Sequence, residues 1–346
     1  MRKICRILFL GWIILFGLAA CGGGQAAPAG PGASAAAAQP GAAPAAEPAE
    51  TPATAPAQTP TQGETLSVRA SFYPMYDFAV KIGGDKVAVV NMVPAGTEPH
   101  DWEPAAADIV GLENAAVFVY NGAGMEHWAE DVLAALENRE LVIAEASEGV
   151  PLLAGHHDHD DEDEAEDEDE EEEGYDPHVW LDPARAKIVM ENIRNAFTQA
   201  DPANQAVYEA NYERYAAELD ELDKTFRDTL APLPNKDIIV AHEAFGYLCA
   251  AYGLNQVPIE GLSPDSEPDP ARMAEIIDFA RERQIKVIFF EELVSPKVAE
   301  TIAAATGAAT AVLNPIEGLS DEEQAAGEDY FSLMRQNLAA LTAALS

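Results

Sequence analysis

Short apolar, β-rich runs alternate with helical patterns along this chain from Leu66 onward. The stretches between these runs are rich in Ala, Leu and Glu at helical spacing. Such an alternation predicts an α/β fold with mostly parallel sheets flanked by helices. The strands are expected at 66–72, 87–92, 116–120, 141–143, 238–241, 256–259, 287–290 and 310–313.

The length of this part predicts two lobes. About 280 residues follow Leu66, which is more than one hydrophobic core usually serves. We place the N-terminal lobe at 66–200, a linking segment at 201–235 and the C-terminal lobe at 236–346.

The linking segment has the pattern of one long helix. Asp201-Pro202 has the form of an N-cap followed by a first-turn proline, and Asp182-Pro183 has the same form earlier in the chain. Aromatic and leucine residues then recur three and four positions apart as far as Leu230. A single helix of roughly 40 Å is expected, joining the lobes. We interpret its apolar stripe as a packed face and not as a cofactor site.

The first twenty residues have the pattern of a secretory signal. Basic residues precede an apolar run that ends in Leu-Ala-Ala-Cys21. This ending resembles the bacterial lipobox, which implies cleavage before Cys21 and lipidation of its thiol. An uncleaved membrane helix is the alternative, although the run is short for a span. Residues 21–65 have no hydrophobic period, and we expect them to consist of the lipidated Cys21 followed by a flexible tether. The rest of the chain is then expected to lie outside the cytoplasm.

The net charge limits the kinds of ligand that the chain can bind, and the cysteine content limits its disulfides. The formal net charge of −40 argues against nucleic acid or anionic lipid as a ligand and agrees with a cationic one. Cys5 lies in the signal and Cys21 is the lipidation site, so Cys249 is the single thiol left and no intramolecular disulfide is expected. Its apolar neighbours indicate a small core residue.

Three histidines, His100, His178 and His242, stand in separate segments of the sequence. His242 directly follows a predicted strand, as Glu291 does. Open α/β sheets bind ligands beyond the carboxyl ends of their strands. Imidazoles gathered from distant segments are typical ligands of a borderline transition metal. The sequence therefore predicts a metal site in the cleft between the lobes.

Four segments also carry a family resemblance: Pro-Ala-Gly-Thr-Glu-Pro-His-Asp-Trp (94–102), Asp-Pro-His-Val-Trp-Leu-Asp-Pro (176–183), Ala-His-Glu-Ala-Phe-Gly-Tyr (241–247) and Phe-Phe-Glu-Glu-Leu-Val-Ser-Pro (289–296). In this order, over 66–346, they resemble the zinc branch of the metal-binding lipoproteins of ABC importers. The resemblance implies two α/β lobes joined by a rigid helix. It also implies a membrane permease and its ATPase as partners, and we expect a monomer.

By this resemblance the ligands of a transported Zn²⁺ are His100, His178, His242 and Glu291. Three imidazoles and one carboxylate complete the tetrahedron that zinc accepts. In the manganese branch a carboxylate typically replaces the third histidine, so His242 favours zinc over manganese or iron. Glu292 or water remain alternatives for the fourth ligand, because adjacent side chains of an extended segment point to opposite faces.

Three acidic residues flank the histidines. Asp101, Glu103 and Asp176 either accept hydrogen bonds from the second ring nitrogens or cap helices. A run at 156–173 holds three histidines and fourteen acidic residues, where the resemblance implies a histidine-rich loop. It either gathers cations weakly or is a solubilising insert.

The competing function is that of a zinc-dependent hydrolase, which needs an open metal position and a general base. His242-Glu243 begins like the metalloprotease motif, but Gly246 stands where the second histidine is needed. We therefore expect a binding protein and not an enzyme. A role as a surface adhesin would rest on analogy alone.

Overall fold

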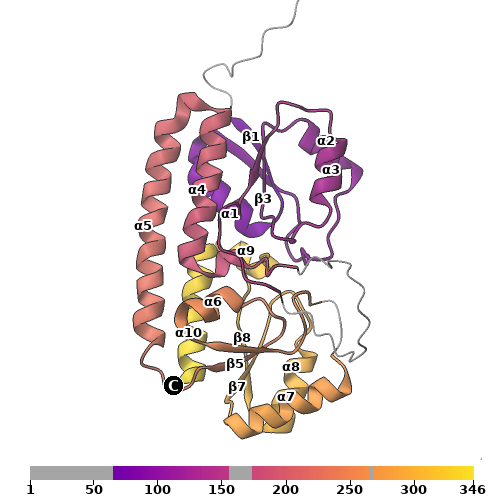
Figure 1. Cartoon of the computed structure of the whole chain (residues 1–346), viewed down its shortest axis with the longest axis vertical. Helices are drawn as coiled ribbons and strands as arrows, with labels where there is room; N and C mark the ends of the chain where they lie inside the picture. Colours follow the sequence, from indigo (N-terminus) through magenta and orange to yellow (C-terminus); the bar gives the residue numbers. More distant parts are fainter. Residues whose placement is uncertain (1–64, 156–173, 265–267) are drawn as a thin grey trace, which may run out of the picture. The chain divides into compact units, whose positions relative to one another are not determined.

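Two four-stranded parallel sheets form the framework of the computed structural model, which describes residues 65–155, 174–264 and 268–346 (Figure 1). Their strand orders are β2-β1-β3-β4 and β6-β5-β7-β8, so the two sheets share one topology. The strands of the first sheet are β1 (Leu66–Ala70), β2 (Val87–Asn91), β3 (Val117–Tyr120) and β4 (Val142–Glu145), and those of the second are β5 (Asp237–Val240), β6 (Asn255–Pro258), β7 (Val287–Phe290) and β8 (Ala309–Val312).

Helices connect and cover the sheets within the described residues. Those around the first sheet are α1 (Tyr73–Gly83), α2 (Ala106–Glu113), α3 (Ala129–Ala135) and α4 (Pro183–Ala200). The long helix α5 (Gln205–Leu230) follows. Those around the second sheet are α6 (Gly246–Tyr252), α7 (Pro270–Arg283), α8 (Lys297–Thr306), α9 (Asp321–Ala326) and α10 (Tyr330–Leu345).

Each sheet is buried on both faces, as parallel sheets require. In the first sheet, Phe118 packs with residues of α2 and α3 in one cluster, while Val68 and Val119 belong to the largest core with α1 and α4. In the second sheet, Ile239 and Ile288 pack against α7 and α8. The largest core runs on from the first sheet through α5 into α6 and α10, which joins the two lobes.

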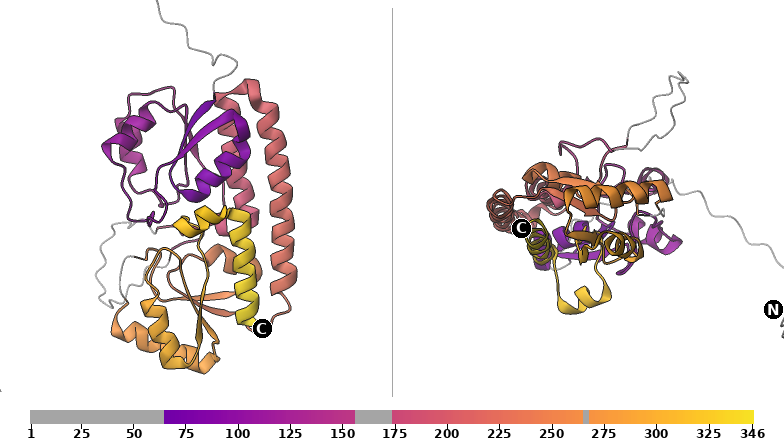
Figure 2. Two further views of the ribbon diagram at one scale, coloured as in Figure 1. Left: turned by 180° about the vertical axis from the view of Figure 1, so that it is seen from behind. Right: turned by 90° about the horizontal axis from the view of Figure 1, so that it is seen from below.

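The long helix α5 contacts α1 and α4 on the first lobe, and α6 and α10 on the second (Figures 1 and 2). Its stripe of Tyr208, Leu219, Leu222, Phe226 and Leu230 is buried, which confirms the packed face predicted from the spacing. The start of the helix differs from the expectation. Pro202–Asn204 forms a 3₁₀ turn, and Asp201 accepts hydrogen bonds from Asn204 Nδ2 and Tyr208 Oη at 2.6 and 2.8 Å.

The α/β class, the two lobes and the linking helix are confirmed, and every predicted strand is present within two residues of its expected bounds. Asp182 is confirmed as the N-cap of α4, since its side chain accepts from Ala184 N. Cys249 is buried, as expected for a small core residue. No helix of the described residues is long and apolar enough to cross a membrane. The signal at 1–20, most of the tether at 21–65 and the run at 156–173 lie outside the described residues.

Candidate metal centre

The three predicted histidines converge. The Nε2 atoms of His100 and His178 lie 3.3 Å apart, and so do those of His178 and His242. His100 comes after β2 and His242 comes two residues after β5, whereas His178 lies in the segment that leads into α4. The segments beyond β2 and β5 therefore meet the start of α4 at one point, where ligands bind in open α/β sheets.

The fourth member of the cluster is Glu317. Its Oε1 lies 3.0 Å from Nε2 of His178, 3.2 Å from that of His242 and 3.5 Å from that of His100. Among the described residues these four side chains form the one group of three or more whose donor atoms lie within 4.8 Å of one another. His178, His242 and Glu317 are buried, while His100 keeps some contact with solvent.

The spacing of these atoms fits a metal ion. Four donors in a tetrahedron at about 2.0–2.1 Å from zinc lie about 3.3 Å from one another. The separations of 3.0–3.5 Å from His178 Nε2 to the other two rings and from Glu317 Oε1 to all three rings are close to that value. Neither carboxylate oxygen of Glu317 has a well-formed hydrogen bond within the described residues, so this buried charge calls for a cation.

Two carboxylates fix the ring nitrogens that face the centre. Asp176 Oδ1 accepts from both the backbone N and Nδ1 of His178, at 2.9 and 2.8 Å. Glu291 lies 2.8 Å from Nδ1 of His242 through both of its oxygens and accepts from its backbone N at 3.1 Å. A proton held on Nδ1 leaves the lone pair of Nε2 free to bind a metal.

The position of Glu291 therefore differs from the role that the resemblance implied. Its carboxylate lies behind His242, on the Nδ1 side, and Glu317 occupies the fourth place of the cluster. Glu292, the other alternative, is exposed. Of the three acidic residues flanking the histidines, Asp176 contacts a ligand ring. Asp101 and Glu103 are exposed, and Glu103 lies 3.7 Å from His127.

Sequence reasoning missed Glu317, although a signal for it was present. Glu317 lies five residues beyond β8, so the rule that ligands bind beyond the carboxyl ends of strands applies to it as it does to His242 and Glu291. A constrained turn presents it. Ile316 has a positive φ of 62°, which is unusual for a β-branched residue. Its backbone N donates to Asn314 Oδ1 at 2.7 Å, and Asn314 in turn exchanges two hydrogen bonds with Asn337 on α10.

The charges and contacts within the centre favour the ionised form of Glu317. Burial alone would raise the pKa of Glu317, but the charge of His242 and the contacts with all three rings hold it well below its usual value. Burial alone would lower the pKa of His242, yet Glu291 and Glu317 raise it well above 6.5. The pKa of His178 is raised because Asp176 and Glu317 outweigh burial, whereas burial dominates at His100 and lowers its pKa.

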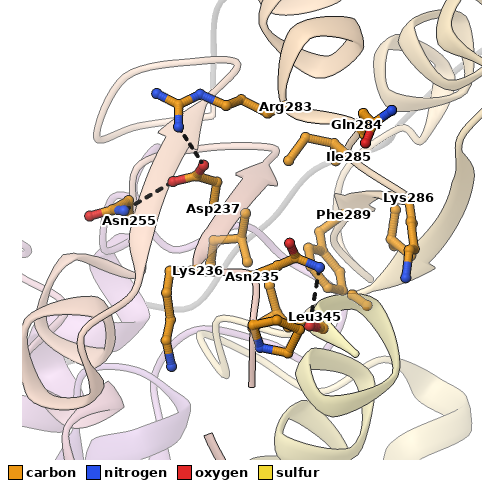
Figure 3. A pocket seen from close by; sticks show the side chains of 14 residues that line it. Asn235, Lys236, Asp237, Asn255, Arg283, Gln284, Ile285, Lys286, Phe289 and Leu345 are labelled. Atoms are coloured by element: carbon orange, nitrogen blue, oxygen red, sulfur yellow. Dashed lines mark hydrogen bonds and ion pairs between the residues drawn. The ribbon is translucent and has the colours of Figure 1, made fainter. Parts of the chain in front are cut away.

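A pocket of about 330 Å³ lies away from the metal centre, at the amino-terminal ends of β5 and β7 (Figure 3). Its three cationic side chains already have partners. Arg283 pairs with Asp237 at 3.7 Å, Lys286 contacts the carbonyl oxygen of Ser346, and Lys236 donates to the carbonyl of Leu230 at 2.6 Å. Because these side chains already bind other parts of the chain, we assign this pocket a structural role in the second lobe and not a ligand.

The fold and the site define a two-lobed α/β protein with a buried histidine–glutamate centre suited to a metal ion. The family model described as zinc-uptake complex component A, periplasmic, matches residues 68–344. The chain belongs to this family.

Individual relatives agree with that assignment. The chain is 46% identical over 281 residues to the high-affinity zinc uptake system protein ZnuA of Bacillus subtilis (strain 168), covering 81% of this chain and 88% of that protein. It is 39% identical over 276 residues to the zinc-binding lipoprotein AdcA of Streptococcus pneumoniae (strain R6), covering 80% of this chain but 55% of AdcA.

A solved structure shows the same architecture. The Zn(II)-bound ZnuA-like domain of Streptococcus pneumoniae AdcA superposes with a TM-score of 0.70 at 36% identity, covering 82% of this chain and 99% of that domain. The chain thus spans one whole domain of this longer relative.

Proposed function

We propose that this protein captures Zn²⁺ outside the cytoplasm and delivers it to the permease of an ABC importer. The observation that carries the proposal is the cluster of His100, His178, His242 and Glu317, whose donor atoms are spaced for tetrahedral zinc. These four residues hold the ion in our proposal, while Asp176 and Glu291 orient the rings. Glu317 replaces Glu291 as the fourth ligand.

The donor set favours zinc over manganese. Three imidazole nitrogens suit zinc, whereas manganese prefers hard oxygen ligands. Four protein donors leave no open position for a reactive water, which argues against a zinc hydrolase. The proposal extends to an ATPase behind the permease, to a lipid anchor at Cys21, to a monomeric state and to lobes at 66–200 and 236–346 joined by 201–235.

Metal loading tests the proposal directly. The purified protein is stripped with a chelator and exposed to equal concentrations of zinc and manganese, and the bound metal is then measured by mass spectrometry. One zinc per chain with little manganese is expected. Equal occupancy by manganese, or zinc that binds as well to a His178→Ala variant, would contradict the assignment of this site.

The affinity for zinc is expected to fall as the pH drops from about 8 to about 5. A proton and the metal compete for Nε2 of each histidine. Because Asp176, Glu291 and Glu317 raise the pKa values of His178 and His242, these rings hold their protons more tightly in the metal-free protein, and binding must release the protons that they carry. Calorimetry in two buffers of different ionisation enthalpy measures the released protons, and competition titrations measure the affinity. An affinity that is flat over this range would rule out imidazole ligation.

A further inference from the structure

The carboxylate of Asp176 stands between the two lobes. It belongs to the segment before α4, on the first lobe, and its Oδ1 holds both the backbone N and the Nδ1 of His178. Asp176 is 4% exposed. Its other oxygen, Oδ2, faces Gly246, the first residue of α6 on the second lobe.

The approach at Gly246 leaves no room for a side chain. A Cβ placed there would lie 2.4 Å from Asp176 Oδ2 and 3.4 Å from Gln256 Nε2, and the first separation is far inside van der Waals contact. Gly246 is the first residue of α6. The close packing against Asp176 accounts for a glycine at this position.

The next residue of α6 holds the same segment through its backbone. Tyr247 Oη donates to the carbonyl oxygen of Asp176 at 2.7 Å and accepts from Leu153 N at 3.0 Å. The guanidinium of Arg185 lies 4.8 Å from the centre of the Tyr247 ring. Tyr247 is fully buried, so the start of α6 contacts Asp176 at both its side chain and its backbone.

We propose that Gly246 is a positioning residue for metal binding: by packing on Asp176 Oδ2, the second lobe fixes the carboxylate that orients His178 of the first lobe. The inference rests on the proposed zinc site and adds a contact between the lobes to it. The orientation of His178 thereby depends on contact between the lobes, and separating them removes the support behind Asp176.

Gly246→Ala tests this role, and Gly261→Ala is its matched control. A Cβ at Gly261 meets no atom within 4 Å, so the same chemical change there should be silent. We expect Gly246→Ala to weaken zinc binding by about 10–100-fold, the usual effect of disturbing an outer carboxylate. The absorption spectrum of the Co²⁺-loaded protein should also shift, which a change in folding stability alone would not produce.

A double-mutant cycle separates this mechanism from general crowding. Without the Asp176 carboxylate the added methyl group meets only Gln256 Nε2, at an ordinary contact distance of 3.4 Å, so Gly246→Ala should weaken zinc binding no further in an Asp176→Ala background. A Gly246→Ala protein that binds zinc like the wild type would overturn the inference alone, as would equal losses in both backgrounds. A wild-type protein without zinc at this centre would instead overturn the proposed function, and the inference with it.

Tyr247→Phe provides a second variant in case Gly246→Ala does not fold. It removes one hydroxyl group and adds no bulk. The change removes both hydrogen bonds of the hydroxyl group, of which the one to the Asp176 carbonyl bears on the metal site. We expect a loss of zinc affinity of about three- to tenfold. An unchanged affinity together with an unchanged Co²⁺ spectrum would show that α6 does not position Asp176.

Discussion

Glu317→Ala is expected to weaken zinc binding by more than about a thousand-fold, whereas Glu291→Ala should cost about 10–100-fold. The difference follows from geometry. Glu317 Oε1 lies within 3.5 Å of all three Nε2 atoms, so in the proposed site its loss removes a direct donor and the negative charge that faces these atoms. Glu291 contacts Nδ1 of His242, so its loss leaves the four donors in place but loosens one ring.

Competition with a chromophoric chelator measures both affinities, and the Co²⁺ spectrum reports the number of donors. Glu317→Gln keeps the shape of the side chain and should lose nearly as much as Glu317→Ala, because an amide does not supply the charge. Glu292→Ala is a matched control, since Glu292 adjoins Glu291 but is exposed. If Glu291→Ala instead lost as much affinity as Glu317→Ala, Glu291 would have to be a direct ligand.

The fold could be predicted from local patterns because its elements depend on local chemistry. Apolar β-rich runs became buried parallel strands, and the stripe from Tyr208 to Leu230 became the packed face of α5. The start of α5 was less predictable. Asp201 has hydrogen bonds with Asn204 and Tyr208 that compete with its expected capping role, so a 3₁₀ turn precedes the helix.

The site could be predicted only in part. The rule that ligands bind beyond the carboxyl ends of strands predicts which segments meet, and it correctly places His242 near Glu291. The rule does not say which nitrogen of His242 a given carboxylate faces. That choice depends on the turn before Glu317, where Ile316 adopts a positive φ held by Asn314. Such a turn depends on contacts with α10 that are distant in the sequence, so no local pattern shows it.

Trp180→Ala is expected to lower the free energy of unfolding of the zinc-free protein by about 3–5 kcal/mol. Trp180 is fully buried and its ring lies edge-on to Phe72, with centroids 5.1 Å apart. It also connects the lobes: its Nε1 donates to the carbonyl of Pro315 at 2.7 Å, and its own carbonyl accepts from Tyr330 Oη at 2.7 Å. Truncation therefore leaves a large cavity beside the centre and an unpaired carbonyl.

Denaturant unfolding with a chelator present measures this loss, because bound zinc would add its own stabilisation. Trp180→Phe separates the contribution of the side-chain volume from that of the hydrogen bond to Pro315. It keeps most of the volume but leaves the Pro315 carbonyl without its donor, for a loss of roughly 1–3 kcal/mol. Pro315 precedes Glu317 by two residues, so this variant should also bind zinc more weakly than the wild type. Val110→Ala, at a position 61% exposed, should change stability by less than about 0.5 kcal/mol. A Trp180→Ala protein as stable as this control would show that the lobes do not depend on the indole for their packing.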